Sequence, residues 1–220
     1  MRILAVTVLI SLCAASGFAA ETLKNEEDKT IYSIGLIISR QLSAFSLTPA
    51  ELELVKVGMT DGVNNTPGVD LAAYNAKVQE LAKTRITAQA EKMAPLNKEL
   101  LEKAAQENGA IKTDSGLIYR SLKEGSGSVP GPKGTVKVHY RGTLANGKEF
   151  DSSYQRGTPL EFKLDSVIAC WKEGVQKMKP GGKAKLVCPP ALAYGDAGMS
   201  SVILPGSTLA FEVELLEVSN

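Results

Sequence analysis

Few residues of this chain could catalyse a reaction, and their types limit the chemistry. A hydrolase of the triad kind needs a base beside its nucleophile, and the chain has a single histidine, His139. In the alternating stretch VKVHYRG, the side chains of His139 and Tyr140 point to opposite faces of a strand. Because apolar residues share the Tyr140 face, we expect His139 on the surface and no triad hydrolase.

Metal, nucleotide and nucleic-acid chemistry also lack their usual patterns. Cys170 and Cys188 do not form a CxxC pair, and two cysteines without a histidine on the inner face do not make a zinc site. There is no dinucleotide fingerprint and no paired-carboxylate pattern, so we expect no metal and no cofactor. Lys+Arg of 25 against Asp+Glu of 24, without a basic block, argues against nucleic-acid binding.

What remains is a set of aromatic and branched side chains carried by different segments. Asp151, Tyr194 and Ile203 fall in the loop-like stretches DSSYQRG and ALAYGDAGMSSVILPGS, where packing alone seldom requires an acid or a phenol. Such a set usually forms a core, but with a few polar groups it can also line a small-ligand pocket. Both interpretations stay open for these residues: Tyr140, Phe150, Phe162, Val167, Ile168, Trp171, Tyr194, Ile203 and Phe211.

The elements that must position this set are mostly strands. Val136, Val138 and Tyr140 alternate with polar residues, and Asn146-Gly147 predicts a hairpin turn before the next strand at Glu149. Further short strands are predicted at 160–164, 184–188 and 209–215, and one helix at 167–178 contains Trp171. Antiparallel strands with a single helix predict an α+β domain whose sheet covers that helix.

The N-terminal half is patterned for helices. Apolar residues step by three and four from Glu26 onward, at Ile31, Ile34, Ile38, Leu42 and Phe45. Thr48-Pro49-Ala50-Glu51 is a capping box for a second helix, which we expect to end from Asp61-Gly62 to Gly68. Asp70 can cap a third, much longer helix that reaches Ala105 and stops at Asn108-Gly109, with Pro95 kinking or dividing it.

The long third helix is too polar to be buried all round and is expected to act as a spacer. Two short helices cannot enclose a core alone, so their apolar stripes are predicted to pack against a second copy of the chain. The alternative is that they fold back on the C-terminal domain.

The first residues, MRILAVTVLISLCAASGFAA, have one positive charge, a short apolar run and a small-residue end. This pattern predicts a signal peptide over 1–20, and the run is short for a membrane span. The alternatives are a buried helix and lipidation at Cys13, which Leu12 disfavours. We therefore expect an exported protein, periplasmic or otherwise, with outer-membrane association left open.

Four motifs resemble a known enzyme family. VKVHYRGTLANGKEFDSS, VIACWKEGVQKMKPGGKAKL, ALAYG and ILPGSTLAFEVELL, in that order, resemble the FKBP-type peptidyl-prolyl cis-trans isomerases over roughly Gly116 to Val218. The segment EDKTIYSIGLIISRQL and the long helix resemble the dimerising part of exported bacterial members, of the macrophage infectivity potentiator and FkpA kind. The resemblance implies a twisted antiparallel sheet wrapped on one helix, with an active pocket between them.

The resemblance also assigns roles by position. Trp171 would be the pocket floor; the backbone N–H of Ile168 and the hydroxyl of Tyr194 would bind substrate carbonyls; and Arg156 with Tyr140 would order the acid Asp151. Leu160 stands where many members have an aromatic wall, and Met199 at a variable rim position, so preference for the residue before proline is expected to differ. The remaining pocket residues would be Phe150, Phe162, Val167, Ile203 and Phe211.

These inferences give a predicted organisation: signal peptide 1–20, helical dimerisation segment 21–69, spacer helix 70–109 and isomerase domain 110–220. The predicted function is X–Pro isomerisation in exported proteins during folding, with added chaperone activity. The alternative is a dimeric holdase with weak isomerase activity. Expected partners are unfolded proline-containing proteins, pocket-binding macrolides and a second copy of the chain.

Cys170 projects away from the neighbouring Trp171 and is predicted to pair with Cys188, which ends a strand just before the Tyr194 loop. A disulfide would persist in an exported protein. The alternative is two buried free thiols.

Overall fold

The computed structural model describes residues 23–199 and 202–219, so the predicted signal peptide and Cys13 lie outside the described residues. The chain divides into two compact units, the first ending at Leu42 and the second beginning at Ser43. In the first unit, helix α2 (Glu26–Leu42) confirms the predicted amphipathic helix. None of its residues is buried.

The second unit begins with 3-10 helix η1 (Ser43–Phe45) and helix α3 (Pro49–Asn64). The capping box is confirmed, because the Thr48 hydroxyl accepts from the Glu51 N–H while the Glu51 carboxylate accepts from the Thr48 N–H. The helix continues through Asp61-Gly62 and ends at Asn64, with Asn65 as its C-cap, whose φ of 57° is left-handed. The turn residues at 61–62 therefore do not stop it, and the later Asn does.

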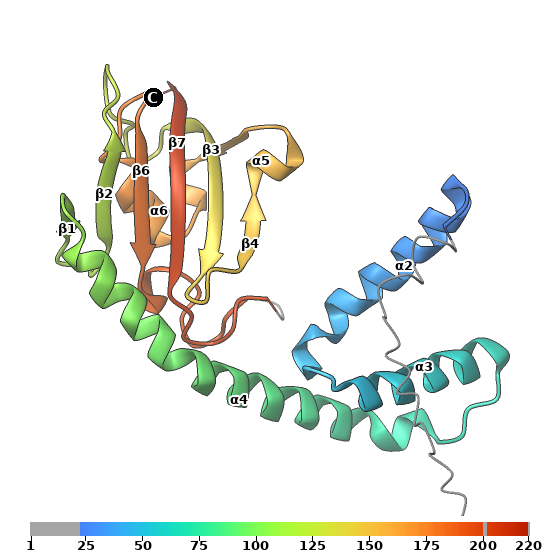
Figure 1. Cartoon of the computed structure of the whole chain (residues 1–220). Coiled ribbons are helices and arrows are strands. Elements are labelled where there is room, and N and C mark those ends of the chain that lie inside the picture. The colour runs from blue at the N-terminus through green and yellow to red at the C-terminus, as the bar shows by residue number, and fades with distance from the viewer. Residues whose placement is uncertain (1–22, 200–201, 220) are drawn as a thin grey trace, which may run out of the picture. The chain divides into compact units, whose positions relative to one another are not determined.

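Helix α4 (Leu71–Gln106) begins at the predicted cap, where Asp70 Oδ1 accepts from the Ala72 N–H at 2.9 Å. Pro95 lies inside it without dividing it, so of the two predicted effects, a kink or a division, the division is absent, and Figure 1 shows one gently curved helix. Arg85 of α4 donates to the Phe45 carbonyl at 2.7 Å and to Glu51 Oε1 at 2.5 Å. These two bonds fasten η1 and the start of α3 to the long helix.

Among the described residues, one antiparallel sheet runs in the order β1-β2-β6-β7-β3-β4, with β5 paired to β3 (Figure 1). The predicted α+β architecture is confirmed, although β1 and β2 were not singled out from the sequence. The strands are β1 (Ala110–Lys112), β2 (Ile118–Lys123), β3 (Thr135–Leu144), β4 (Glu149–Ser152), β5 (Leu160–Lys163), β6 (Lys183–Cys188) and β7 (Leu209–Ser219).

One face of the sheet covers the short helix α6 (Ala169–Val175), as predicted. The 3-10 turn η2 (Leu164–Ser166) contacts α6, and the 3-10 turn η3 (Pro190–Leu192) follows β6 along the chain. Val138 and Leu186 belong to this core and are fully buried. A Cβ on Gly174 of α6 would lie only 2.7 Å from a Leu186 methyl carbon. The glycine is needed because helix and sheet approach too closely for a side chain.

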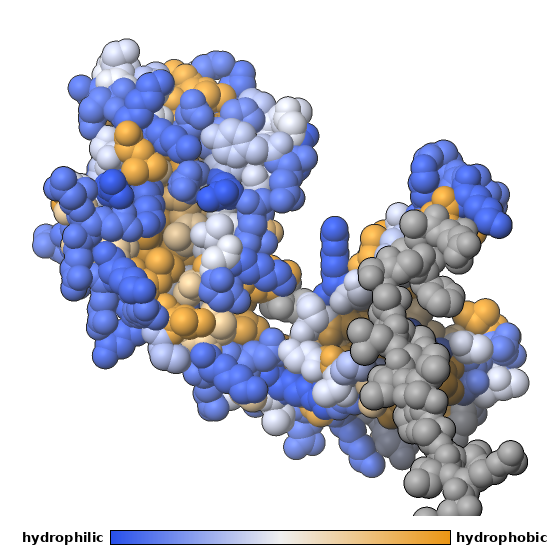
Figure 2. Space-filling model, in the orientation of Figure 1, coloured by the Kyte–Doolittle hydropathy of each residue, from blue (hydrophilic) through white to orange (hydrophobic). Residues whose placement is uncertain are grey.

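The opposite face of the sheet receives the last turns of α4. Ala104, Ile118 and Val187 form a second buried cluster there, since Ile118 and Val187 each follow a residue that faces the main core. Figure 2 shows apolar surface gathered where α4 meets the sheet, while much of the remaining face is hydrophilic. The end of the predicted spacer is thus packed against the sheet domain.

The predicted disulfide is present. Cys170, in the first turn of α6, is bonded to Cys188, the last residue of β6, with a Cα–Cα distance of 5.7 Å. Both residues are fully buried. The bond joins the helix that carries Trp171 to the strand that leads into the Tyr194 loop.

Candidate active site

A cavity of about 480 Å³ opens between α6 and the inner face of the sheet. It brings together every residue that the sequence assigned to the pocket, and it adds Ser166 and Val202, which the sequence did not single out. The lining is Tyr140, Phe150, Asp151, Leu160, Phe162, Ser166, Val167, Ile168, Trp171, Tyr194, Met199, Val202, Ile203 and Phe211.

Several of the predicted pocket residues belong to the hydrophobic core and also line the cavity. Tyr140, Trp171, Ile203 and Phe211 are each no more than 5% exposed and belong to the hydrophobic core, yet they also face the cavity. The cavity is therefore a gap in the core itself. Its walls are held by the same packing that stabilises the domain.

The Trp171 indole is the centre of an aromatic cluster. Tyr140 and Phe211 meet it edge-to-face, with ring centroids at 5.0 and 5.2 Å, and Phe162 lies at 5.4 Å. Phe150 meets Phe211 edge-to-face at 5.6 Å. Edge-to-face contacts add to the area buried by each ring, so the indole is held firmly in one orientation.

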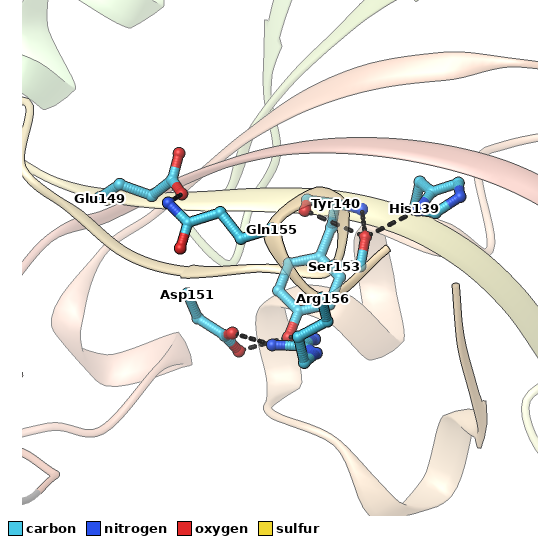
Figure 3. A network of polar contacts seen from close by, with 7 residues as sticks. All are labelled: His139, Tyr140, Glu149, Asp151, Ser153, Gln155 and Arg156. Atoms are coloured by element: carbon cyan, nitrogen blue, oxygen red, sulfur yellow. Dashed lines mark hydrogen bonds and ion pairs between the residues drawn. The ribbon is translucent and has the colours of Figure 1, made fainter. Parts of the chain in front are cut away.

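The polar corner of the cavity is built on Asp151. Its two carboxylate oxygens accept from the Tyr140 hydroxyl and from the Arg156 guanidinium, which also donates to the Tyr140 oxygen at 2.9 Å (Figure 3). Burial raises the pKa of Asp151, but the hydrogen bonds from Tyr140 and Arg156 outweigh it and hold that pKa below its usual value. The aspartate is therefore ionised and oriented at neutral pH.

Arg156 is supplied by a short helix that the sequence did not predict, α5 (Ser153–Arg156). Buried Ser153 begins it, and its hydroxyl accepts from the Tyr140 N–H at 2.8 Å and lies 2.9 Å from His139 Nδ1 (Figure 3). His139 also stacks on Tyr154, with centroids 4.7 Å apart. The histidine thus lies outside the cavity, as the strand alternation predicted.

The loop side of the cavity carries Tyr194, two residues after η3, and Ile203, which is bridged to Met199. Burial, and then the nearby charge of Asp151, raise the pKa of the Tyr194 phenol. The phenol remains protonated over the physiological range and can donate a hydrogen bond. Val167 and Ile168 enter from the other side, with Ile168 at the N-cap of α6.

No group of three metal-binding side chains occurs in 23–199 or 202–219. No helix within those ranges is long and apolar enough to cross a membrane. The site offers shape, aromatic surface and a few oriented polar groups.

Comparison with known proteins defines the class that this fold and cavity belong to. A model of the FKBP-type peptidyl-prolyl cis-trans isomerase domain matches residues 127–216, and a model of the domain amino terminal to it matches residues 27–120. The chain belongs to the FKBP-type peptidyl-prolyl cis-trans isomerases, enzymes that interconvert the cis and trans forms of X–Pro bonds.

Particular relatives follow from the same comparison. The chain is 38% identical to the FKBP-type isomerase FkpA of Escherichia coli K12, over 99% of this chain and 90% of that protein. It is 36% identical to the FKBP-type 22 kDa isomerase of the same organism, over 87% and 95% of the two chains. The crystal structure of E. coli FkpA aligns with a TM-score of 0.64, covering 89% of this chain and 98% of that one.

Proposed function

We propose that the cavity is the isomerase site and that Trp171 is the floor on which the substrate proline ring sits. The hydroxyl of Tyr194 and the backbone N–H of Ile168 bind the carbonyls that flank the proline. Asp151, oriented by Tyr140 and Arg156, provides the fixed charge of the site. The observation that carries this proposal is the convergence of residues from four strands, a helix and a loop on one cavity.

The proposed mechanism needs no nucleophile. Rotation about a peptide bond meets a barrier of about 18–20 kcal/mol, because the planar amide is stabilised by resonance. In the twisted transition state the nitrogen loses conjugation and the amide becomes less polar. An apolar floor of edge-packed rings favours that state over the planar one, while fixed donors hold the neighbouring carbonyls in the required geometry.

The test is a protease-coupled isomerisation assay with proline tetrapeptides, using Trp171→Ala, Tyr194→Phe and Asp151→Ala. Tyr154→Phe is the matched control, because that phenol lies outside the cavity and donates to Glu214. We expect each pocket variant to lose rate and the control to retain it. Unchanged rates in all three pocket variants would refute the site.

The pH profile provides a second test of the same site. Because the pKa of Asp151 lies below its usual value, its carboxylate should stay ionised at every pH above that usual value. We therefore expect no change in kcat/KM from titration of Asp151 between about pH 5 and 8, because this range lies above the ordinary carboxyl pKa. A rate that falls between pH 7 and 5 without loss of fold would contradict the role given to Asp151.

We further infer that the natural substrates are exported proteins and that 1–20 is a signal peptide. The leader pattern supports this, as does a buried disulfide, which persists in oxidising compartments. Slow X–Pro steps can limit folding after export. Mass spectrometry of the mature N-terminus, together with cell fractionation, tests the proposal.

Exposed apolar side chains on α2 favour two added properties, homodimerisation and chaperone activity. Ile31, Ile34 and Ile37 are 60%, 55% and 58% exposed, and apolar side chains gathered on one exposed helix mark a surface for contact with another protein. We assign 21–69 to dimerisation, 70–109 to the spacer and 110–220 to isomerisation. Sedimentation of the Ile34→Glu variant measures its oligomeric state and so tests the dimer. An aggregation assay with the Trp171→Ala variant tests whether chaperone activity is separate from catalysis.

A further inference from the structure

Asn97 is a polar residue buried on a mostly exposed helix. Its side chain lies on α4 two residues after Pro95 and belongs to a residue only 7% exposed. Its Oδ1 accepts from the Thr208 N–H at 3.0 Å, and its Nδ2 donates to the Gly206 carbonyl at 3.0 Å. One amide therefore satisfies a donor and an acceptor of the same backbone segment, about 110 residues further along the chain.

That segment is the base of the loop that carries the rim of the cavity. The Gly206 N–H donates to the Gly195 carbonyl at 3.0 Å, so two successive hydrogen bonds connect Asn97 to the residue after Tyr194. The Gly195 N–H in turn donates to the Pro190 carbonyl at 2.9 Å. A continuous series of hydrogen bonds thus runs from the helix through the loop base to the Tyr194 turn.

The other side of the same segment supports Ile203. The Ser207 N–H donates to the Leu204 carbonyl at 3.2 Å, and Ile203 exchanges two backbone hydrogen bonds with Met199 at 2.8 and 3.1 Å. Immediately after Thr208, strand β7 begins at Leu209 and carries Phe211 into the cavity. The Asn97 contact therefore lies where the rim loop joins the wall strand.

The helix that carries Asn97 is itself fixed on the sheet. Beyond the Ala104 cluster, Glu107 at its C-cap binds Lys185 of β6 and, at 2.6 Å, Arg120 of β2. The hydrogen bond from Lys185 and the one from Arg120 lower the pKa of Glu107 against the opposing effect of burial. The last three turns of α4 thus form a rigid support, and Asn97 stands at their start.

We propose that Asn97 is a positioning residue for isomerisation: helix α4 holds the rim loop of the active site through this amide. The proposal rests on the pocket assignment made above, because it concerns the placement of Tyr194 and Ile203. Preorganised contacts lose much of their effect when they shift by about 1 Å, so a released loop base should slow the reaction while the floor remains intact. The long helix would then be part of the catalytic domain's support.

The experiment compares Asn97→Leu and Asn97→Asp in the full chain. Leucine removes both hydrogen bonds at similar volume; aspartate keeps the acceptor for Thr208 but sets a carboxylate oxygen against the Gly206 carbonyl. Asn75→Leu is the matched control, because Asn75 is an exposed asparagine on the same helix. Kinetics with proline tetrapeptides and amide hydrogen exchange are measured at a temperature where every variant is folded.

For Asn97→Leu we expect kcat/KM to fall about five- to tenfold, the range that one or two net hydrogen bonds supply. The loss should fall mainly on kcat, because the rim holds the twisted state. The amides of Gly206 and Thr208 should exchange faster while those of β3 and β7 do not. In Asn97→Asp, Thr208 should stay protected although the rate still falls.

Two results would overturn the proposal. One is a kcat/KM of Asn97→Leu equal to that of Asn75→Leu while Tyr194→Phe is impaired, which leaves the pocket assignment intact and removes only the role of Asn97. The other is uniform acceleration of exchange in every strand with unchanged kcat, which indicates a purely structural role. If Tyr194→Phe and Trp171→Ala are both fully active, the pocket assignment fails first and this proposal fails with it.

Discussion

Removing the disulfide should destabilise the protein without disabling its active site. The bond joins residues 18 apart in sequence, Cys170 on α6 and Cys188 on β6. In the chain-entropy treatment a loop of this length loses about 11 cal/mol/K in the unfolded state, which at 25 °C is about 3 kcal/mol of stability. The effect acts on the unfolded chain, so the native site should persist.

The assay is urea unfolding of the wild type with and without reductant, which removes the cross-link but no atoms of the side chains. The double variant Cys170→Ala/Cys188→Ala, measured under both conditions, is the control and should not respond to reductant. We expect the reductant to lower the free energy of unfolding by about 3 kcal/mol. For the folded double variant, kcat/KM should stay within about twofold, because the helix keeps its core contacts.

A reductant effect below about 1 kcal/mol would refute the entropic reasoning, since an 18-residue separation predicts three times that. A large loss of kcat/KM in a fully folded double variant would show instead that the bond positions Trp171 directly.

Three further predictions follow from contacts elsewhere. Gly142→Ala should cost about 1–3 kcal/mol of stability and weaken pocket ligands, because its Cβ would lie 2.6 Å from the Phe150 ring; calorimetry and ligand titration measure both. Thr208→Val should be neutral or stabilising by up to about 1 kcal/mol in urea unfolding, because its buried hydroxyl has no partner within the described residues. Hydrogen bonds from Arg85 and Thr48 lower the pKa of Glu51 to about 2 from 4.5, so the α3–α4 contact should be complete above pH 4.5 and lost as pH falls toward 2, a change visible by NMR titration and absent in Glu51→Gln.

An unperturbed ligand affinity in Gly142→Ala would mean that Phe150 moves aside at no cost. A destabilisation of Thr208→Val by more than about 1 kcal/mol would reveal a hydrogen bond to that hydroxyl. An NMR titration of Glu51 with an ordinary carboxyl midpoint would contradict the contact with Arg85.

The parts of the fold that sequence reasoning predicted are those governed by local pattern. The capping box at Thr48, the alternation through Tyr140 and the turn at Gly147 each depend on a few neighbouring residues. The helix start, the strand and the turn can therefore be predicted from the local sequence. The pocket residues were found through family motifs, because their convergence depends on the order of the strands in the sheet.

What was missed depends on contacts between distant segments. Strand β2 has two buried residues at its start and then mixed ones, so its alternation is weak. Helix α5 is four residues long and is ended by Gly157, too short to show a period. Asn97 resembles any polar residue on a solvated helix, and only its contact with Thr208 reveals that it is buried. Pro95 lies within α4 and the helix continues past it, because tertiary contacts such as those of Asn97 and Ala104 hold the residues that follow the proline.

The packing of α4 on the sheet has a practical consequence for dissecting the protein. A fragment that starts at residue 110 would leave Ile118 and Val187 without the Ala104 turn that covers them, and Lys185 without its carboxylate partner. It would lose stability and solubility for reasons unrelated to the removed N-terminal helices. A fragment that starts before Pro95 keeps this cover, so it is the sounder piece with which to ask what the isomerase domain does alone.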